Sequence, residues 1–198
     1  MGAATERITQ SGLSEQLVRT CQDGSPEAQR ELYECYKAKV YSLAVYLTGD
    51  AETAKDLTQE IFLKVFRDLR AFRFESTFSS WLYRLATNTC LNALRSRRAR
   101  REVEIEEVLG TPAEIDAGYS LEQRQVDRST QRAVRKAILS LKPPLRAVVV
   151  LRYIENLSYA EIAEALSCSE GTVASRLSRA HRLLERKLKS GAGRLGRS

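Results

Sequence analysis

The N-terminal half of the chain repeats apolar residues every three or four positions, which is the spacing of one face of an amphipathic helix. Between residues 26 and 47 this stripe consists of Leu32, Tyr33, Tyr36, Val40, Leu43, Ala44 and Leu47. We predict a helix over Pro26–Leu47, ended by Gly49, and a second helix that begins after Asp50. The same spacing predicts that the second helix covers about Ala51–Leu69 and that a third covers about Thr77–Arg98.

The C-terminal half shows the same period from Ala133 to Leu141, after which Pro143 and Pro144 begin a new helix. The valine-rich run 147–154 has strand propensity, but helix-compatible segments flank it and no partner strand is visible. We therefore predict that this run is helical and that the fold is all-α.

Two more helices are predicted near the C-terminus. Ser158 and Glu161 form the S-x-x-E pattern of a capping box before a short apolar helix. A turn at about residues 166–168 separates it from a helix that runs to about Lys189, with Ser167 and Ser169 both candidates for its N-cap.

Charge divides the chain into two basic modules around an acidic segment. Five of the seven residues from Arg95 to Arg101 are arginine. Residues 102–127 carry eight acids and one base, a net charge of −7, whereas residues 176–198 carry eight bases and one acid, a net charge of +7. Gly110, Pro112 and Gly118 interrupt the acidic segment, so we interpret it as an irregular linker between two small helical domains. The expected organisation is an N-terminal segment 1–24, a helical domain 25–101, an acidic linker 102–128, a second helical domain 129–190 and a basic tail 191–198.

The composition favours a nucleic-acid partner and no metal. The chain has 198 residues and a net charge of +7, which suits a polyanion. Its four cysteines, Cys21, Cys35, Cys90 and Cys168, lie at no metal-ligand spacing, and His181 is the only histidine. We therefore expect reduced cysteines, no metal site and no cofactor. Neither an apolar run of about 18 residues nor the apolar core of a signal peptide is present, so we expect a cytoplasmic protein without a membrane span.

An enzyme acting on nucleic acid would need clustered carboxylates or a His/Cys constellation. The acids here lie in the linker or on helix faces without a converging set, so we do not expect an enzyme.

The last predicted helix has two different faces. At about 100° per residue, Val173, Leu177, Ala180 and Leu184 fall on one side, and Gly171, Ser175, Ser178, Arg179 and Arg182 fall on the other. A small and basic face fits the major groove of DNA. The alternative is a solvated charged face on a helical hairpin.

The segment that reads LSYAEIAEALSCSEGTVASRLSRAHRLL resembles the helix-turn-helix of region 4 of bacterial sigma factors, which reads the promoter −35 element. Other transcription regulators share this motif, so the alternative function is a DNA-binding regulator that does not join RNA polymerase. Many relatives carry a basic residue at the position of Ala174, which affects the expected −35 sequence and not the docking mode. The expected −35-binding residues are Ser158, Tyr159, Thr172, Ala174, Ser175, Arg176, Ser178, Arg179 and Arg182.

The N-terminal domain resembles sigma region 2. The resemblance rests on the pattern D-x-x-Q-E-x-F, here residues 56–62, and on F-x-x-W-L-Y-R-L-A-x-N, here residues 78–88. Both regions occur in the order of the family, and the short chain is similar to the extracytoplasmic-function (ECF) class. The resemblance implies core RNA polymerase and promoter DNA as partners, and commonly an anti-sigma factor that covers both domains.

The resemblance places core-polymerase binding at Asp56, Gln59 and Glu60, whose oxygens would accept from arginines of the partner. The alternative is that they form solvated surface or intrahelical pairs. It also implies that a loop at about residues 71–78 captures a base flipped from the −10 element. The expected −10-binding residues are Phe72, Arg73, Phe74, Asn88, Asn92, Arg95, Arg97 and Arg98, because aromatic rings stack on bases and guanidinium groups hold phosphates. Trp81 lies on the apolar stripe, and we expect it in the core.

In the family, the linker occupies the RNA path of polymerase and is expelled by the growing transcript. The net charge of −7 over residues 102–127 would suit a positively lined channel. The alternative is that these acids keep the linker away from the DNA-binding faces of the protein itself.

Overall fold

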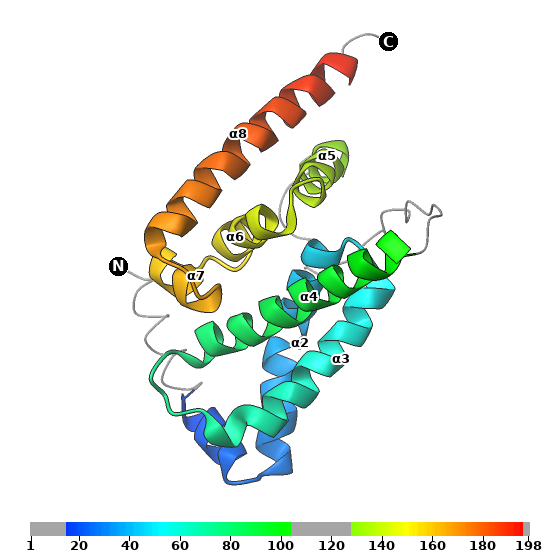
Figure 1. The fold of residues 1–198 in the computed structure, drawn as a ribbon. Coiled ribbons are helices and arrows are strands. Elements are labelled where there is room, and N and C mark those ends of the chain that lie inside the picture. The colour runs from blue at the N-terminus through cyan, green and yellow to red at the C-terminus, as the bar shows by residue number, and fades with distance from the viewer. Residues whose placement is uncertain (1–14, 104–127, 196–198) are drawn as a thin grey trace.

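The structure is a computed structural model that describes residues 15–103 and 128–195, with side chains over residues 15–97 and 131–189. Every regular element in these ranges is helical, as the sequence predicts (Figure 1). Two helical domains are present, one on either side of residues 104–127.

The N-terminal domain is a bundle of α2 (Pro26–Thr48), α3 (Ala51–Asp68) and α4 (Phe78–Val103), with residues 15–22 also helical. Gly49 ends α2 in the left-handed conformation (φ 78°), and its N–H donates to the carbonyl of Val45 over 2.8 Å. The carboxylate of Asp50 then caps α3 by accepting from the N–H of Thr53 over 3.0 Å. Both predicted caps are therefore confirmed.

The ends of α3 and α4 differ from the predicted ones. The α3 helix tightens into a 3₁₀ turn, η1 (Leu69–Ala71). The α4 helix runs to Val103, five residues beyond the predicted Arg98, because the arginine-rich segment consists of good helix formers without glycine or proline. The helix thus enters the first two residues of the segment interpreted as a linker.

The C-terminal domain consists of α5 (Arg128–Leu139), α6 (Pro143–Tyr153), α7 (Tyr159–Ala165) and α8 (Glu170–Leu195). The valine-rich run is helical as predicted, and its residues Ala147–Leu151 are all buried. The capping box is complete: Ser158 N–H donates to Glu161 over 2.7 Å, and Glu161 N–H donates to the Ser158 hydroxyl over 3.2 Å. Ser169 caps α8 by accepting from Thr172 N–H, whereas Ser167 lies in the preceding turn with φ 49°.

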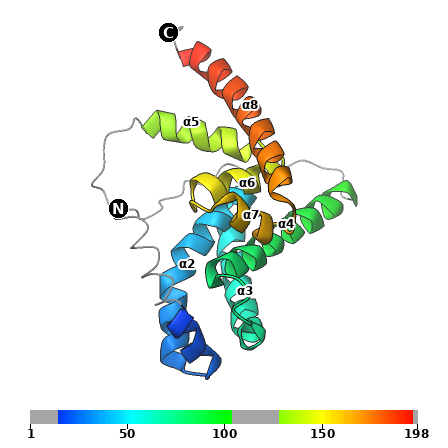
Figure 2. The ribbon, with the colours of Figure 1, turned by 90° about the vertical axis from the view of Figure 1, so that its left-hand side faces the viewer.

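The two domains also pack against each other, which the sequence does not predict. The α5 and α6 helices lie against α2, and α7 lies against α4 (Figure 2). Buried apolar residues of the two domains form one continuous cluster.

Candidate functional site

The three predicted polymerase-binding residues lie together on one exposed strip of α3. Asp56, Gln59 and Glu60 are exposed, whereas the residues on the opposite side of the helix are buried, namely Leu57, Ile61 and Val65. Glu60 accepts from the ammonium of Lys64 over 2.5 Å. The intrahelical pairing considered as an alternative is thus present for Glu60. An exposed pair of this kind contributes little to stability.

The loop between η1 and α4 is built around an aromatic cluster. Phe72 is buried, and its ring centroid lies 4.9 Å from that of Phe74 and 5.3 Å from that of Trp81. Phe74 is half-buried at φ 58°, and the Arg19 guanidinium lies 4.2 Å from its ring centroid. Trp81 is half-buried and packs on the core without being enclosed by it. Arg73 is the exposed member of the predicted loop set.

The N-terminal helical segment fixes this loop. The side-chain amide of Gln22 donates to the carbonyls of Leu69, over 2.9 Å, and Phe72, over 2.8 Å. Because both carbonyls lie on the turn that leads into the aromatic cluster, the loop is positioned before any ligand binds.

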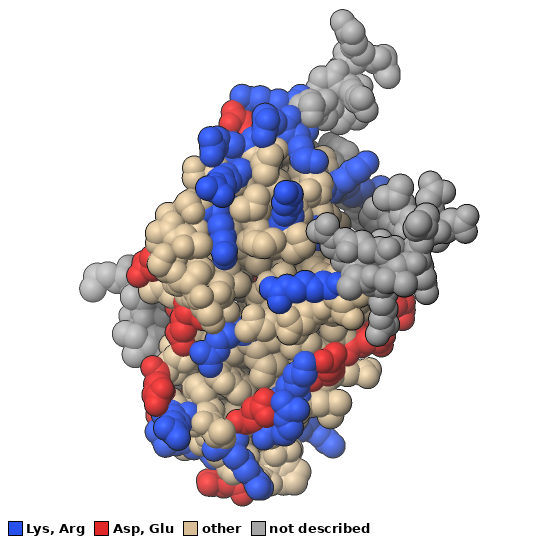
Figure 3. Space-filling model, in the orientation of Figure 1, with Lys and Arg blue, Asp and Glu red and all other residues tan. Residues whose placement is uncertain are grey.

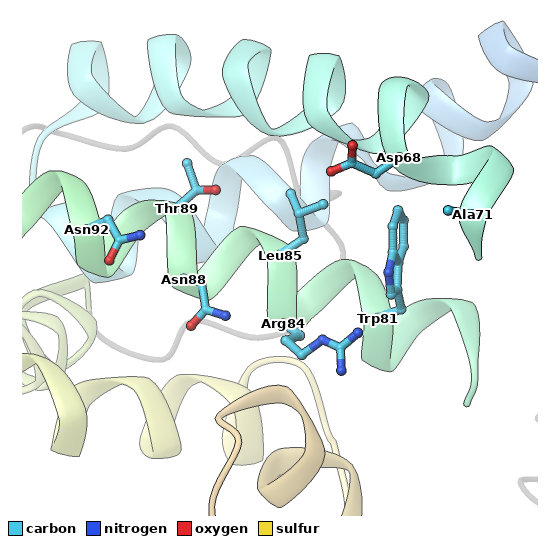
Figure 4. A pocket seen from close by; sticks show the side chains of 8 residues that line it. All are labelled: Asp68, Ala71, Trp81, Arg84, Leu85, Asn88, Thr89 and Asn92. Carbon is cyan, nitrogen blue, oxygen red and sulfur yellow. The ribbon is translucent and has the colours of Figure 1, made fainter. Parts of the chain in front are cut away.

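A pocket of about 360 Å³ lies beside α4 (Figure 4). Asn88 and Asn92, both predicted, line it and are exposed. Arg84 also lines it and points to the same side of α4 as Asn88 (Figure 4). Arg84 is not among the expected −10-binding residues, although it belongs to the F-x-x-W-L-Y-R-L-A-x-N pattern and its spacing of four residues from Asn88 places both on one helix face. The other lining residues are Asp68, Ala71, Trp81, Leu85 and Thr89.

Two arginines of the predicted basic cluster make contacts within the domain. Arg95 donates to the side-chain oxygen of Asn92 over 3.0 Å. Arg97 donates to the Thr53 hydroxyl over 2.9 Å and lies 3.9 Å from the Asp50 carboxylate. Hydrogen bonds from the side chain and backbone of Thr53 hold the pKa of Asp50 below its ordinary value, with a smaller effect from the charge of Arg97. The side chain of Arg98 lies outside the described residues.

The α8 helix has the two faces that the sequence predicts. Val173, Leu177 and Ala180 are buried. Thr172 and Arg176 are half-buried, and Arg176 donates to the sulfur of Cys168 over 3.8 Å. The remaining predicted −35-binding residues of α7, α8 and the α7 N-cap are exposed, namely Ser158, Tyr159, Ala174, Ser175, Ser178, Arg179 and Arg182.

A groove of about 1010 Å³ runs between α8 and the connection from α5 to α6. Its charged lining residues are strongly basic, with Glu185 as the one acid among Lys142, Arg176, Arg179, Arg182, Arg186 and Lys187. Figure 3 shows lysine and arginine side chains gathered over the α8 end of the molecule. This end of the described structure therefore presents a positive surface to a polyanion.

Neither a metal-binding cluster nor a membrane-spanning helix is found among the described residues. Within residues 15–103 and 128–195, no group of three or more His, Cys, Asp or Glu side chains is placed to hold a metal ion. No helix in the same ranges is long and apolar enough to span a bilayer. Burial raises the pKa of Cys21 to about 11 and that of Cys90 to about 12, so both remain thiols at neutral pH.

Two family models match the two domains. The model for sigma-70 region 2 matches residues 32–100, and the model for sigma-70 region 4 matches residues 131–184. The chain is 31% identical to the ECF RNA polymerase sigma factor SigW of Bacillus subtilis, an alignment that covers 87% of this chain and 95% of SigW. It is 36% identical to the RNA polymerase sigma-H factor of Pseudomonas aeruginosa, over 88% of this chain and 93% of that protein.

Solved structures share the fold. The sigma factor RpoE of Bartonella quintana, solved in complex with the anti-sigma factor NepR, matches with a TM-score of 0.67 at 22% identity and covers 81% of this chain and 96% of RpoE. CnrH, solved in complex with the cytosolic domain of CnrY, matches with the same TM-score and identity and covers 89% of this chain and 97% of CnrH. The two matched regions in their expected order, together with relatives that align over nearly their whole length, place this chain in the ECF class of RNA polymerase sigma factors.

Proposed function

We propose that this sigma factor binds core RNA polymerase through the exposed strip of α3, reads the −10 element through α4 and its preceding loop, and reads the −35 element through α8. The observation that carries the proposal is that exposed polar and basic side chains form two separate surfaces, one on α4 and the other on α8. One helix lies in each region matched by a sigma-70 model. The acidic and amide side chains of α3 form a third surface of different chemistry.

The pocket beside α4 suits an unstacked base of the −10 element. The Trp81 ring offers a stacking surface, and the side-chain amides of Asn88 and Asn92 offer both donors and acceptors to a base edge. Arg84 and Arg95 lie close enough to this face to hold neighbouring phosphates. Phe72 is buried, so its contribution is to shape the loop that carries Arg73 and Phe74.

The exposed face of α8 suits the major groove at the −35 element. The small residues Ala174, Ser175 and Ser178 allow the helix to approach base edges closely. Arg179 reaches bases, and Arg182 mainly holds a phosphate farther along the helix. Arg176 is half-buried against Cys168, which fits a phosphate contact at the margin of the interface.

The α3 strip suits a partner that offers arginines and an apolar contact. Leu63 lies one turn after Glu60 and is 72% exposed, the largest fraction among the exposed large apolar side chains of the described structure. Protein interfaces commonly have an apolar core surrounded by a polar rim, and Leu63 among Asp56, Gln59 and Glu60 fits that arrangement. We expect Leu63 to contribute to core binding together with the three polar residues.

The solved relatives suggest how this sigma factor is controlled. RpoE was solved with the anti-sigma factor NepR, and CnrH was solved with CnrY. We propose an anti-sigma factor as a regulator of this chain and a cytoplasmic location, in which polymerase and promoter DNA are available.

Binding to core polymerase is the test of the proposal against its alternative. The purified chain is mixed with core enzyme, and the complex is separated by size-exclusion chromatography. Co-elution with core at near-stoichiometric amounts supports a sigma factor. A chain that binds DNA specifically but never co-elutes with core would be a regulator of the helix-turn-helix class that does not join polymerase.

A further inference from the structure

A short helical segment, residues 15–22, precedes the three-helix bundle and lies outside residues 32–100, which the sigma-70 region 2 model matches. Val18 and Cys21 of this segment are buried in the core of the bundle. Gly24 then turns the chain toward α2 in the left-handed conformation, with φ 91°, and its N–H donates to the carbonyl of Cys21 over 3.1 Å. The segment is therefore a fixed part of the N-terminal domain, and it lies at the end that carries η1 (Figure 1).

The side-chain amide of Gln22 ties the two ends of the η1 turn together. The Leu69 carbonyl accepts from the Phe72 N–H over 3.0 Å, which closes the turn. The Gln22 amide nitrogen donates to the same carbonyl over 2.9 Å and to the Phe72 carbonyl over 2.8 Å. An amide nitrogen has two hydrogens to donate, so both are used within the protein. Gln22 thus holds in place the turn from which the loop before α4 begins.

Arg19, on the same helical segment, contacts that loop directly. In the described structure, the loop of residues 72–77 between η1 and α4 forms neither helix nor strand. Phe74 in this loop has φ 58°, a conformation that non-glycine residues rarely adopt and that the surroundings must hold. Its ring packs on that of Phe72, with centroids 4.9 Å apart, and the Arg19 guanidinium lies 4.2 Å from the Phe74 ring centroid. Glu15 orients this guanidinium by accepting from it over 2.7 Å.

We propose that Gln22 and Arg19 are positioning residues for −10 recognition, which hold the loop of residues 72–77 in the shape that accepts an unstacked base. The inference rests on the proposed function. A loop that must order itself around a ligand loses conformational entropy on binding, whereas a loop that is already held avoids this loss. The two side chains act through Phe72 and Phe74, so neither has to touch the DNA.

Two simpler roles lead to different results. If Gln22 only stabilises the domain, its loss lowers the free energy of unfolding and leaves base preference unchanged. If the exposed Arg19 holds a phosphate, its loss weakens binding to every sequence equally and makes binding less dependent on salt. Positioning differs from both, because it changes the preference for one base and leaves the salt dependence as it was.

Gln22→Glu tests the tie with a side chain of nearly the same shape. A carboxylate cannot donate to the two carbonyls and is repelled by both, so the loop should loosen. Gln22→Lys is the rescue, because an ammonium group can donate again. Gln16→Glu is the matched control, since Gln16 is exposed and the change places the same charge on the same helical segment. Arg19→Ala removes the contact with Phe74.

Trp81 reports the state of the loop in the free full-length chain. It is the only tryptophan of the sequence, and its ring centroid lies 5.3 Å from that of Phe72. We expect acrylamide to quench Trp81 fluorescence more strongly in Gln22→Glu and Arg19→Ala than in the wild type. Gln22→Lys and Gln16→Glu should remain close to the wild type. Circular dichroism and urea unfolding verify that every variant is folded.

Base preference is measured on holoenzyme. Core polymerase with each full-length variant is mixed with random single-stranded DNA oligomers, and the bound oligomers are sequenced. Phe74→Ala identifies the position that the loop reads. At that position we expect Gln22→Glu to lower the preference about tenfold, the usual effect of a lost hydrogen bond of this kind, and Arg19→Ala to lower it about two- to fivefold. Gln22→Lys should restore the preference, and the affinity for core should be the same throughout.

The outcomes separate this inference from the proposed function. Wild-type base preference in a folded Gln22→Glu holoenzyme would overturn the inference, whether or not the variant is less stable. Equal losses on all oligomers for Arg19→Ala, with a flatter salt dependence, would overturn the role of Arg19 and make it a phosphate contact. A wild-type chain that never joins core, or a holoenzyme that enriches no oligomer, would refute the proposed function and this inference with it, even if Trp81 quenching shows that the loop is held.

Discussion

The carboxylate of Glu60 accepts a hydrogen bond from the ammonium of Lys64, one turn later on the same exposed side of α3. The Lys64 ammonium also donates to the Thr89 hydroxyl on α4 over 3.3 Å. Lys64 therefore links the strip proposed to bind polymerase with the helix proposed to bind the −10 element. A cation of the partner would replace Lys64 as the donor to Glu60, and neither α3 nor α4 would have to unfold for this exchange.

Replacement of Gln59 and Glu60 together by alanine should weaken core binding by about 1–3 kcal/mol if the contacts are charge-assisted. The helix content should not change, because both side chains are exposed. Competition against a labelled sigma factor for core enzyme measures the effect. Glu52→Ala is the control, since Glu52 forms a similar exposed pair with Lys55 on the same helix. Unaltered affinity of the double variant would remove both residues from the docking surface.

Arg179→Ala should relax the preference for one base of the −35 element and cost about 1–3 kcal/mol, whereas Arg182→Ala should weaken binding to all sequences and flatten its salt dependence. Holoenzyme binding to a set of −35 variants at several salt concentrations distinguishes the two effects. Lys189→Ala is the control, because Lys189 lies two turns beyond Arg182 and pairs with Glu185. Equal losses on every sequence for Arg179→Ala would identify Arg179 as a phosphate contact.

The Asp50 N-cap of α3 should make the free energy of unfolding depend on pH in the acid range. The pKa of Asp50 is lowered in the folded protein, so its contribution is present above the pKa of the unfolded state and is lost as the pH falls through the folded value. Asp50→Ala should cost about 0.5–2 kcal/mol at neutral pH. Urea unfolding at pH 7 and pH 3 should show that this difference shrinks in acid. A difference of the same size at both values would mean that the carboxylate charge contributes nothing.

The acidic linker should affect initiation as well as connect the domains. If it occupies the RNA path, neutral glutamine replacements should weaken holoenzyme formation and change the ratio of abortive to full-length transcripts. If it shields the DNA-binding faces, the free protein should bind nonspecific DNA more tightly, and the abortive ratio should stay normal. Unchanged core affinity with an unchanged abortive pattern would exclude the first role. The residues to replace, all outside the described part of the structure, are Glu104, Glu106, Glu107, Glu114 and Asp116.

Local features of the fold were predictable because their causes are local. The left-handed Gly49, the Asp50 cap and the Ser158–Glu161 capping box each depend on residues within a few positions of one another. The structure of the valine-rich run 147–154 was harder to predict, because valine by itself favours strands. The run is helical because it packs among the other helices of the domain.

Contacts between residues far apart in the chain could not be predicted, because no local sequence pattern indicates them. Nothing near Tyr83 indicates that its hydroxyl meets Glu155, 72 residues later. Within the candidate site, the exposed face of α8 was predicted from the helical spacing of its residues. Asn88 and Asn92 were predicted only from the resemblance to sigma region 2. Phe72 shows the limit of that reasoning: its aromatic type suited base stacking, but its neighbours Phe74, Phe78 and Trp81 enclose the ring.

Run-off transcription with purified core RNA polymerase tests the central claim most directly. The chain is added to core enzyme that lacks any other sigma factor, together with a library of promoter fragments from the source genome. Our account predicts discrete run-off products from a subset of fragments, which depend on both a −10 and a −35 element and disappear when the chain is omitted. Absence of any chain-dependent product, under conditions in which another sigma factor supports initiation by the same core, would contradict it.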